Sequence, residues 1–142
     1  MNDVGMQLDP DIAALVAAMN ESGLIQTIGS CQGHPRRFCD PYVYFSTSSA
    51  TAARIAVALR KWGRGPSKCL AVEWQLIGHF DAEGELRFRL QAPQYCEISR
   101  SYVGSFVQFY CKKLQVRSDL TKLADLMHQT LSDIAGRSAA KG

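Results

Sequence analysis

One loop holds the side chains of this chain that are best able to do chemistry. Residues 31–41 lie between two segments that predict strands and carry a thiol, an imidazole and two guanidinium groups, at Cys31, His34, Arg36 and Arg37. A loop held by rigid strands exposes and aims such groups, so binding and catalytic residues tend to lie in loops of this kind. We therefore predict a functional site here, although these residue types alone do not name a reaction.

The thiol of Cys31 has two interpretations. A thiol is nucleophilic as the thiolate, and the cationic side chains of His34, Arg36 and Arg37 would favour that form. Alternatively, Cys31 packs as a small apolar group, because no second base or orienting carboxylate is identified beside it. The catalytic residues are therefore left unassigned.

The loop also contains three side chains of the types that bind metals. Cys31, His34 and Cys39 are separated by two and by four residues, a spacing that a tetrahedral zinc ion can use. A fourth ligand is missing from the loop, and the candidates elsewhere are distant in sequence: Cys69, His79 and Cys96. Zinc and a metal-free loop therefore stand as alternatives, and no metal ligand is assigned.

Small residues and hydrogen-bond donors in the same loop predict anion binding. Gly29 and Gly33 let the backbone come close to a ligand, while the hydroxyl and the cationic side chains can donate to phosphate or carboxylate. We predict these ligand-binding residues: Ser30, Cys31, Gly33, His34, Arg36 and Arg37. The alternative is a turn whose glycines serve backbone geometry alone. The sequence contains neither the dinucleotide-binding nor the P-loop fingerprint.

This loop resembles a segment of the wybutosine-synthesising tRNA methyltransferase family. That family has a stretch of the type Thr-x-Ser-Ser-Cys-Ser-Gly-Arg after an N-terminal helix, and the matching residues here are Thr27, Ser30, Cys31 and Gly33. The resemblance covers residues 20–47. The chain departs from the family pattern at three positions, where it has Gly29, Gln32 and His34.

The resemblance implies an α+β domain that binds S-adenosylmethionine and a modified guanosine of tRNA without a Rossmann glycine motif. It would make Ser30, Cys31 and Gly33 pocket residues. The match is too short to imply methyl transfer itself, so a related domain that kept the pocket and changed its ligand is an equal expectation.

Composition predicts a soluble protein with one domain, residues 1–142, of which 137–142 form a flexible tail. The formal charge of +3 and the pI of 8.7 favour anionic partners, including RNA. No apolar run approaches the 18 or so residues that span a bilayer, so we expect no membrane contact. Five cysteines without a close-spaced framework indicate reduced thiols and a cytoplasmic location.

The periodicity of apolar residues predicts an α+β fold with a mainly antiparallel sheet and helices packed on one face. The expected helices are residues 10–22, a segment capped by Ser48 or Ser49 that runs to about Lys61, a segment from Ser99 to at least Leu114, and residues 119–135. The expected strands cover residues 24–30, 42–47, 70–80 and 86–90. Apolar residues at helical spacing predict the buried sides of the first, second and last helices: Ile12, Leu15, Val16 and Met19; Ile55, Leu59 and Trp62; and Leu120, Leu123, Met127, Leu131 and Ile134. Asp9 should cap the first helix and Ser118-Asp119 the last, while Gly23 and Gly136 should end these two helices. The segment 70–90 reads as a β-hairpin.

A second basic surface is suggested by the hairpin. Arg87 and Arg89 alternate with apolar residues and so share one exposed face, and Tyr42 or Tyr44 could stack on a base. Arg60, Lys61 and Arg64 could extend this surface. The competing interpretation is a solvated outer face without a ligand.

Two functions therefore remain open. The first is a ligand-binding enzyme of the methyltransferase type that uses the loop as its pocket. The second is a non-catalytic binding or assembly module in which the loop is structural or recognises an anionic partner. We also expect a homodimer, because one predicted helix carries more aromatic residues than a single face needs, at Tyr102, Phe106, Phe109 and Tyr110.

Overall fold

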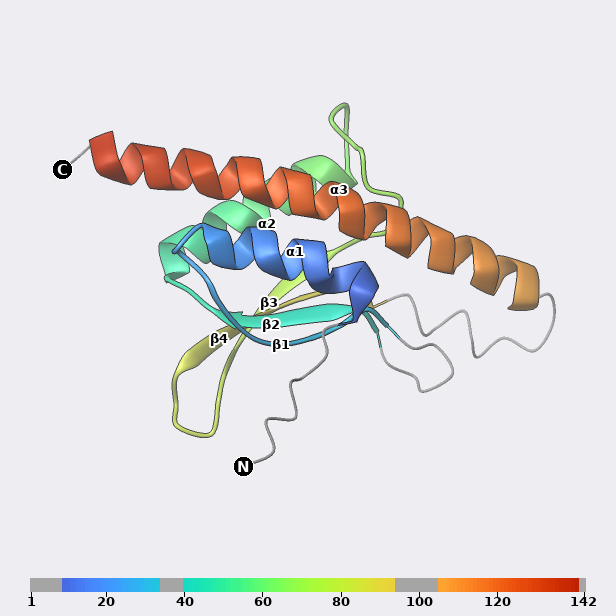
Figure 1. The fold of residues 1–142 in the computed structure, drawn as a ribbon, viewed down its shortest axis with the longest axis horizontal. Coiled ribbons are helices and arrows are strands. Elements are labelled where there is room, and N and C mark those ends of the chain that lie inside the picture. The colour runs from blue at the N-terminus through green and yellow to red at the C-terminus, as the bar shows by residue number, and fades with distance from the viewer. Residues whose placement is uncertain (1–8, 34–39, 94–104, 141–142) are drawn as a thin grey trace.

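A computed structural model describes residues 9–33, 40–93 and 105–140 (Figure 1). The side chains of residues 105–110, 112 and 138–140 are also outside this description. The elements follow in the order α1 (Pro10–Glu21), β1 (Gln26–Cys31), β2 (Tyr42–Ser46), α2 (Ser49–Gly63), β3 (Gln75–Phe80), β4 (Leu86–Gln91) and α3 (Ser105–Ala140). Most of the expected elements are present, with boundaries shifted by at most two residues except in β3 and α3.

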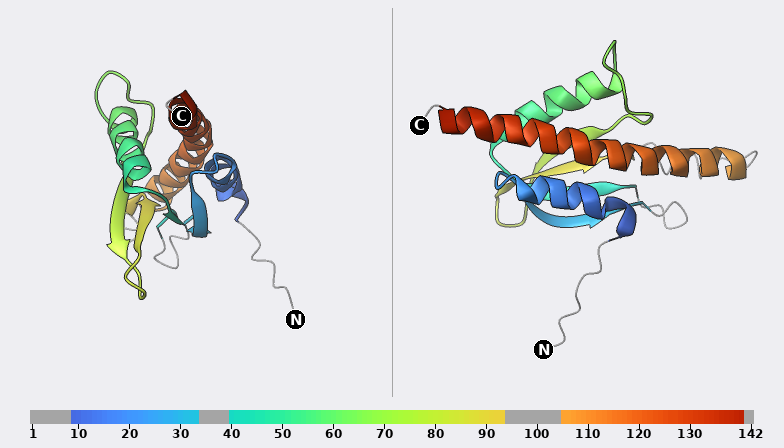
Figure 2. Two further views of the ribbon diagram at one scale, coloured as in Figure 1. Left: turned by 90° about the vertical axis from the view of Figure 1, so that its left-hand side faces the viewer. Right: turned by 45° about the horizontal axis from the view of Figure 1, so that its top comes forward.

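The four strands form one antiparallel sheet in the order β1-β2-β4-β3. All three helices lie on the same side of this sheet, as both views in Figure 2 also show. The prediction of an α+β fold with helices on one face is therefore confirmed. Among the described residues, no helix covers the other side, which we call the open face.

Alternation along the strands explains why the helices gather on one side. Val43 and Phe45 of β2 are buried, and they pair with Leu90 and Phe88 of β4, so these four side chains point to the same face. The intervening residues point to the open face. One face of the sheet is thus apolar enough to require a covering layer.

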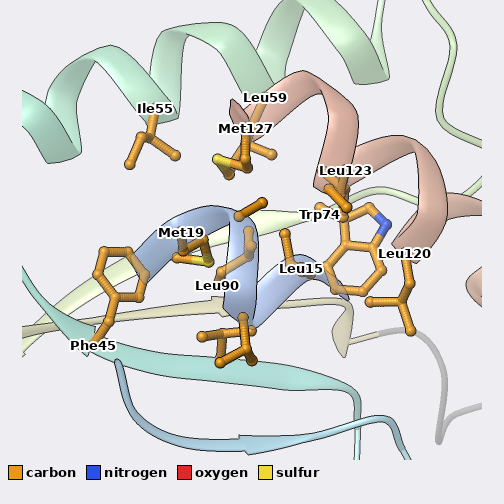
Figure 3. Close-up of a cluster of buried hydrophobic side chains, with 14 of the residues drawn as sticks. Leu15, Met19, Phe45, Ile55, Leu59, Trp74, Leu90, Leu120, Leu123 and Met127 are labelled. Carbon is orange, nitrogen blue, oxygen red and sulfur yellow. The ribbon is translucent and has the colours of Figure 1, made fainter. Parts of the chain in front are cut away.

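The core lies between the sheet and the helix layer (Figure 3). The predicted stripe of α1 is buried, and so is the stripe of α3. Helix α2 adds Ile55 and Leu59. The confirmed stripe residues are Ile12, Leu15, Val16 and Met19 of α1 and Leu120, Leu123, Met127, Leu131 and Ile134 of α3.

Helix α1 begins at the predicted residue, but the side chain of Asp9 does not cap it as predicted. Pro10 occupies the first turn, where its missing N–H is harmless. Asp9 holds the N-cap position but makes no side-chain cap hydrogen bond to the helix. Its Oδ2 instead accepts the backbone N–H of Gln32 at 3.1 Å. The predicted cap is therefore wrong, because a backbone donor from the loop after β1 takes the carboxylate.

The end of α1 and the start of α2 agree with the sequence. Gly23 has a φ of 70°, the left-handed conformation that the predicted end of α1 requires. Ser48 caps α2, since its side chain accepts the backbone N–H of Thr51.

The two C-terminal helices expected from the sequence are one continuous helix of 36 residues. Asp119 lies inside it and is fully buried, so the predicted cap at Ser118-Asp119 is wrong. The expected end at Gly136 is also wrong, because α3 continues to Ala140. Residues 137–140, expected in a tail, are therefore helical. Neither α3 nor the other two helices has a stretch apolar enough to cross a bilayer within the described residues.

The strand expected at residues 70–80 forms only from Gln75 onward. Leu70, Val72 and Trp74 are buried as their alternation predicts, but their segment pairs with no strand. One carbonyl and one carboxylate accept hydrogen bonds from its backbone instead. The Trp62 carbonyl accepts the N–H of Leu70, and the Asp119 carboxylate accepts the N–H of Val72. A helix end and a side chain thus replace the strand partner that the sequence pattern implied.

Candidate nucleic-acid interface

The predicted loop is anchored to α1 where it leaves the sheet. Gln32 accepts the backbone N–H of Asp11 through Oε1 at 3.1 Å, and its own N–H is donated to Asp9. Gly33 follows with a φ of 94°, a conformation that suits glycine. The first residues of the loop are therefore held by two hydrogen bonds to the N-terminus of a helix.

Cys31 is only 8% exposed, and its Sγ accepts the backbone N–H of Gly33 at 3.4 Å. A thiol in this position is poorly placed to attack a substrate, so the described geometry favours a packing role for Cys31.

The register separates two of the predicted site residues. Cys31 lies opposite Tyr42, which points to the open face, whereas Ser30 lies opposite the buried Val43. Residues directly opposite in an antiparallel pair share a face, so the side chains of Ser30 and Cys31 point to opposite sides of the sheet. Gly33 is close to Cys31. The other predicted site residues, His34, Arg36 and Arg37, and the potential ligand Cys39 lie outside the described residues.

Two rows of residues cross all four strands on the open face, and most of their side chains are polar or aromatic. One row joins Gly29, Tyr44, Arg89 and Ile77, and the next joins Cys31, Tyr42, Gln91 and Gln75. The start of the predicted loop and the two tyrosines are thus parts of one surface.

Arg89 is the centre of this surface. Its guanidinium carbon lies 4.2 Å from the centroid of the Tyr42 ring, within the range of a cation–π interaction. Its Nε is buried and makes no hydrogen bond. Within the described part of the chain, no carboxylate pairs with Arg89. The charge of Arg89 is therefore compensated by a ring alone.

A second aromatic pair lies beside Arg89. The rings of Tyr44 and His79 stack with centroids 5.2 Å apart and an angle of 13° between their planes. The neighbouring Arg87 is neutralised, since its Nε donates to Asp81 Oδ2 at 3.0 Å. The open face thus presents two tyrosines, a histidine and one arginine that no acid of the described segments pairs with; we call these four side chains the platform: Tyr42, Tyr44, His79 and Arg89.

The sequence indicated part of this platform. The sequence placed Arg87 and Arg89 on one face and named Tyr42 or Tyr44 as a base-stacking residue, but it considered His79 only as a distant candidate metal ligand. The signal for His79 was available, because the hairpin puts it directly opposite Arg87. The expected extension of this basic surface through Arg60, Lys61 and Arg64 is wrong. These three residues belong to α2 or directly follow it, so they lie on the other side of the sheet.

Comparisons of this chain with protein-family models, with curated proteins and with solved structures find no match. The functional argument therefore depends on the geometry of the open face. Among the described residues, no cluster of three or more potential ligands could hold a metal ion.

Proposed function

We propose that this protein binds single-stranded RNA on the open face of its sheet. The observation that carries the proposal is Arg89, a cation for which the described residues supply no acidic partner, and which lies against Tyr42 and beside the stacked pair of Tyr44 and His79. Four-stranded antiparallel sheets that expose aromatic rings bind single strands by stacking bases on those rings. Arginine adds cation–π contacts and attracts phosphates.

The electrostatics of the chain support an anionic ligand of this kind. The whole protein carries a formal charge of +3, so the long-range field favours a polyanion. The platform, however, has one uncompensated cation rather than a basic cluster. We therefore expect stacking to supply most of the affinity and phosphate contacts to supply a smaller part.

The proposal can be tested by fluorescence anisotropy with a labelled single-stranded RNA of about 10 nucleotides, within the usual site sizes. Tyr44→Ala should weaken binding about 5- to 100-fold, the range for loss of one stacked base. Arg89→Ala should weaken binding and also flatten its dependence on salt, because one cation is removed. Tyr44→Phe should keep most of the affinity, since it retains the ring.

Arg54→Ala is the matched control. Arg54 is an exposed arginine of α2, in the helix layer and away from the open face, so its loss removes the same charge without touching the platform. Circular dichroism checks that each variant is folded. Equal effects of the Arg54 and Arg89 changes, or no binding by the wild-type protein at low salt, would contradict the proposal.

Binding of S-adenosylmethionine stays a prediction from the sequence resemblance. Ser30 and Cys31, two of the three residues that the resemblance would make pocket residues, point to opposite faces of the sheet. The described residues therefore do not form a common wall for this cofactor, and we derive no step through it. Calorimetry with S-adenosylmethionine, alone and with RNA, tests the prediction directly.

A further inference from the structure

Strand β3 forms an edge of the sheet and lacks the features that usually protect an edge. It contains no charged residue and no proline, and its register with β4 is unbroken. Ile77 is 41% exposed and Phe80 is 71% exposed. The opposite edge, β1, is interrupted by a bulge between Thr27 and Gly29. A regular, uncharged and apolar edge is a template for pairing with another strand.

A pocket lies directly beside this edge, between α2 and β3. Its volume is about 490 Å³. Its apolar wall is formed by Ala56, Leu59, Trp74 and Leu76, and Arg60 and Arg64 also line it. The volume is ample for an aromatic side chain.

We propose that a second copy of this chain covers the edge by antiparallel pairing of β3 with the partner's β3, with the Gly78 residues of the two copies opposite each other. The two sheets would become one sheet of eight strands. This inference does not depend on RNA binding, because it concerns the edge and the helix side of the sheet rather than the open face.

The register follows from which side chains share a face. Phe80 pairs with Leu86, and Leu76 pairs with the buried Leu90, so Phe80 and Leu76 both point to the helix side of β3. With Gly78 opposite the partner's Gly78, each Phe80 comes to lie opposite a Leu76 of the other copy. The exposed ring of each copy then enters the α2–β3 pocket of the other.

Charge complementarity supports the same arrangement. The turn after β3 carries Glu83 and Glu85, besides the Asp81 that pairs with Arg87 of its own chain, and in the proposed register it extends past Gln75 of the other copy. The residues there are basic: Arg60, Lys61 and Arg64, at the end of α2 and just beyond it. Arg64 pairs with Glu73 of its own chain, so Arg60 and Lys61 are the cations that we expect to meet the partner's turn. Opposite charges therefore meet at both ends of the interface.

The first test is the mass of the full-length protein in solution, measured by light scattering after size-exclusion chromatography. The wild-type protein should be a dimer of twice 15.7 kDa. Phe80→Asp should raise the dissociation constant of the dimer at least about 30-fold, as expected for loss of a central anchor. Ile28→Asp is the matched control: it changes an apolar residue that is 44% exposed on the opposite edge, and it should leave the dimer intact.

A charge exchange tests the register independently of Phe80. Arg60→Glu and Glu83→Arg should each weaken the dimer, because each places like charges at both contacts. An equimolar mixture of the two variants should form dimers again, since every contact then joins a glutamate to an arginine. A monomeric wild-type protein, a dimer unaffected by Phe80→Asp, or a mixture that stays monomeric would overturn the proposal.

Discussion

At the scale of single residues, the neighbours of a charge decide its role. Arg87 and Arg89 are two positions apart on β4 and point to the same face. Arg87 donates to Asp81, whereas Arg89 lies on the ring of Tyr42. The first arginine is therefore a structural partner of the turn, whereas the second is the one on which we base the proposed RNA binding.

Asp81 gives a prediction at the same scale. The backbone N–H of Glu85 donates to its carboxylate and is the main reason that its pKa lies below 3.8, with Arg87 and the N–H of Glu83 acting in the same direction and burial opposing them. Because the folded state lowers this pKa, the contribution of Asp81 to stability is fully present above its unfolded value and is lost as the pH falls through the folded value. The amide resonances of Glu83 and Glu85 should therefore shift with a midpoint at lower pH than an ordinary aspartate shows. Asp81→Asn should abolish this transition, and a transition that persists in this variant would contradict the assignment.

At the scale of elements, one buried carboxylate joins α3 to the segment before β3. Asp119 accepts the backbone N–H groups of Ala71 and Val72, both at 2.8 Å, and the indole N–H of Trp74 at 3.1 Å. One turn further along α3, Lys122 donates to the carbonyl of Cys69. The segment before β3 is thus ordered by a helix that follows it in the chain.

Asp119→Ala should lower the free energy of unfolding by about 3 kcal/mol or more, because it leaves three donors without their acceptor, two of them in buried bonds. Denaturant unfolding followed by circular dichroism measures this loss. Asp125→Ala removes an exposed acid from the same helix and should change stability by less than about 0.5 kcal/mol. Similar losses in the two variants would show that Asp119 has no special role.

At the scale of the whole molecule, the two proposals meet on one surface. Pairing through β3 would place two platforms on the same face of an eight-stranded sheet. The β2 strands of the two copies would be five strand spacings apart, about 24 Å. A single RNA strand that spans this distance could bind both platforms at once.

The affinity for RNA should therefore depend on its length. Lengthening the RNA from about 4 to about 16 nucleotides should strengthen binding by the wild-type protein more than about tenfold through bivalency. Phe80→Asp should remove most of this gain while leaving the affinity for the short RNA unchanged. Titrations of both proteins with both RNAs measure the effect, and an equal gain in the two proteins would contradict it.

The elements that the sequence predicted correctly are those whose signals are local. Apolar residues at helical spacing identified the buried faces of α1, α2 and α3, and alternation identified the hairpin of β3 and β4. Gly23 and Ser48 marked helix ends in the way that their backbone and side chain require. These features depend on neighbours within a few residues, so the sequence contains all the information they need.

The tertiary structure decided where polar groups find their partners. Asp9 and Asp119 look like helix caps, but each accepts from backbone far away in the chain, at Gln32 and at Ala71 and Val72. Distant segments likewise brought Tyr44 of β2 and His79 of β3 together. A carboxylate accepts equally well from a near or a distant N–H, so local pattern cannot choose between them. Local pattern therefore determined the α+β class and the core, whereas packing between distant segments determined the platform, the continuous α3 and the exposed edge.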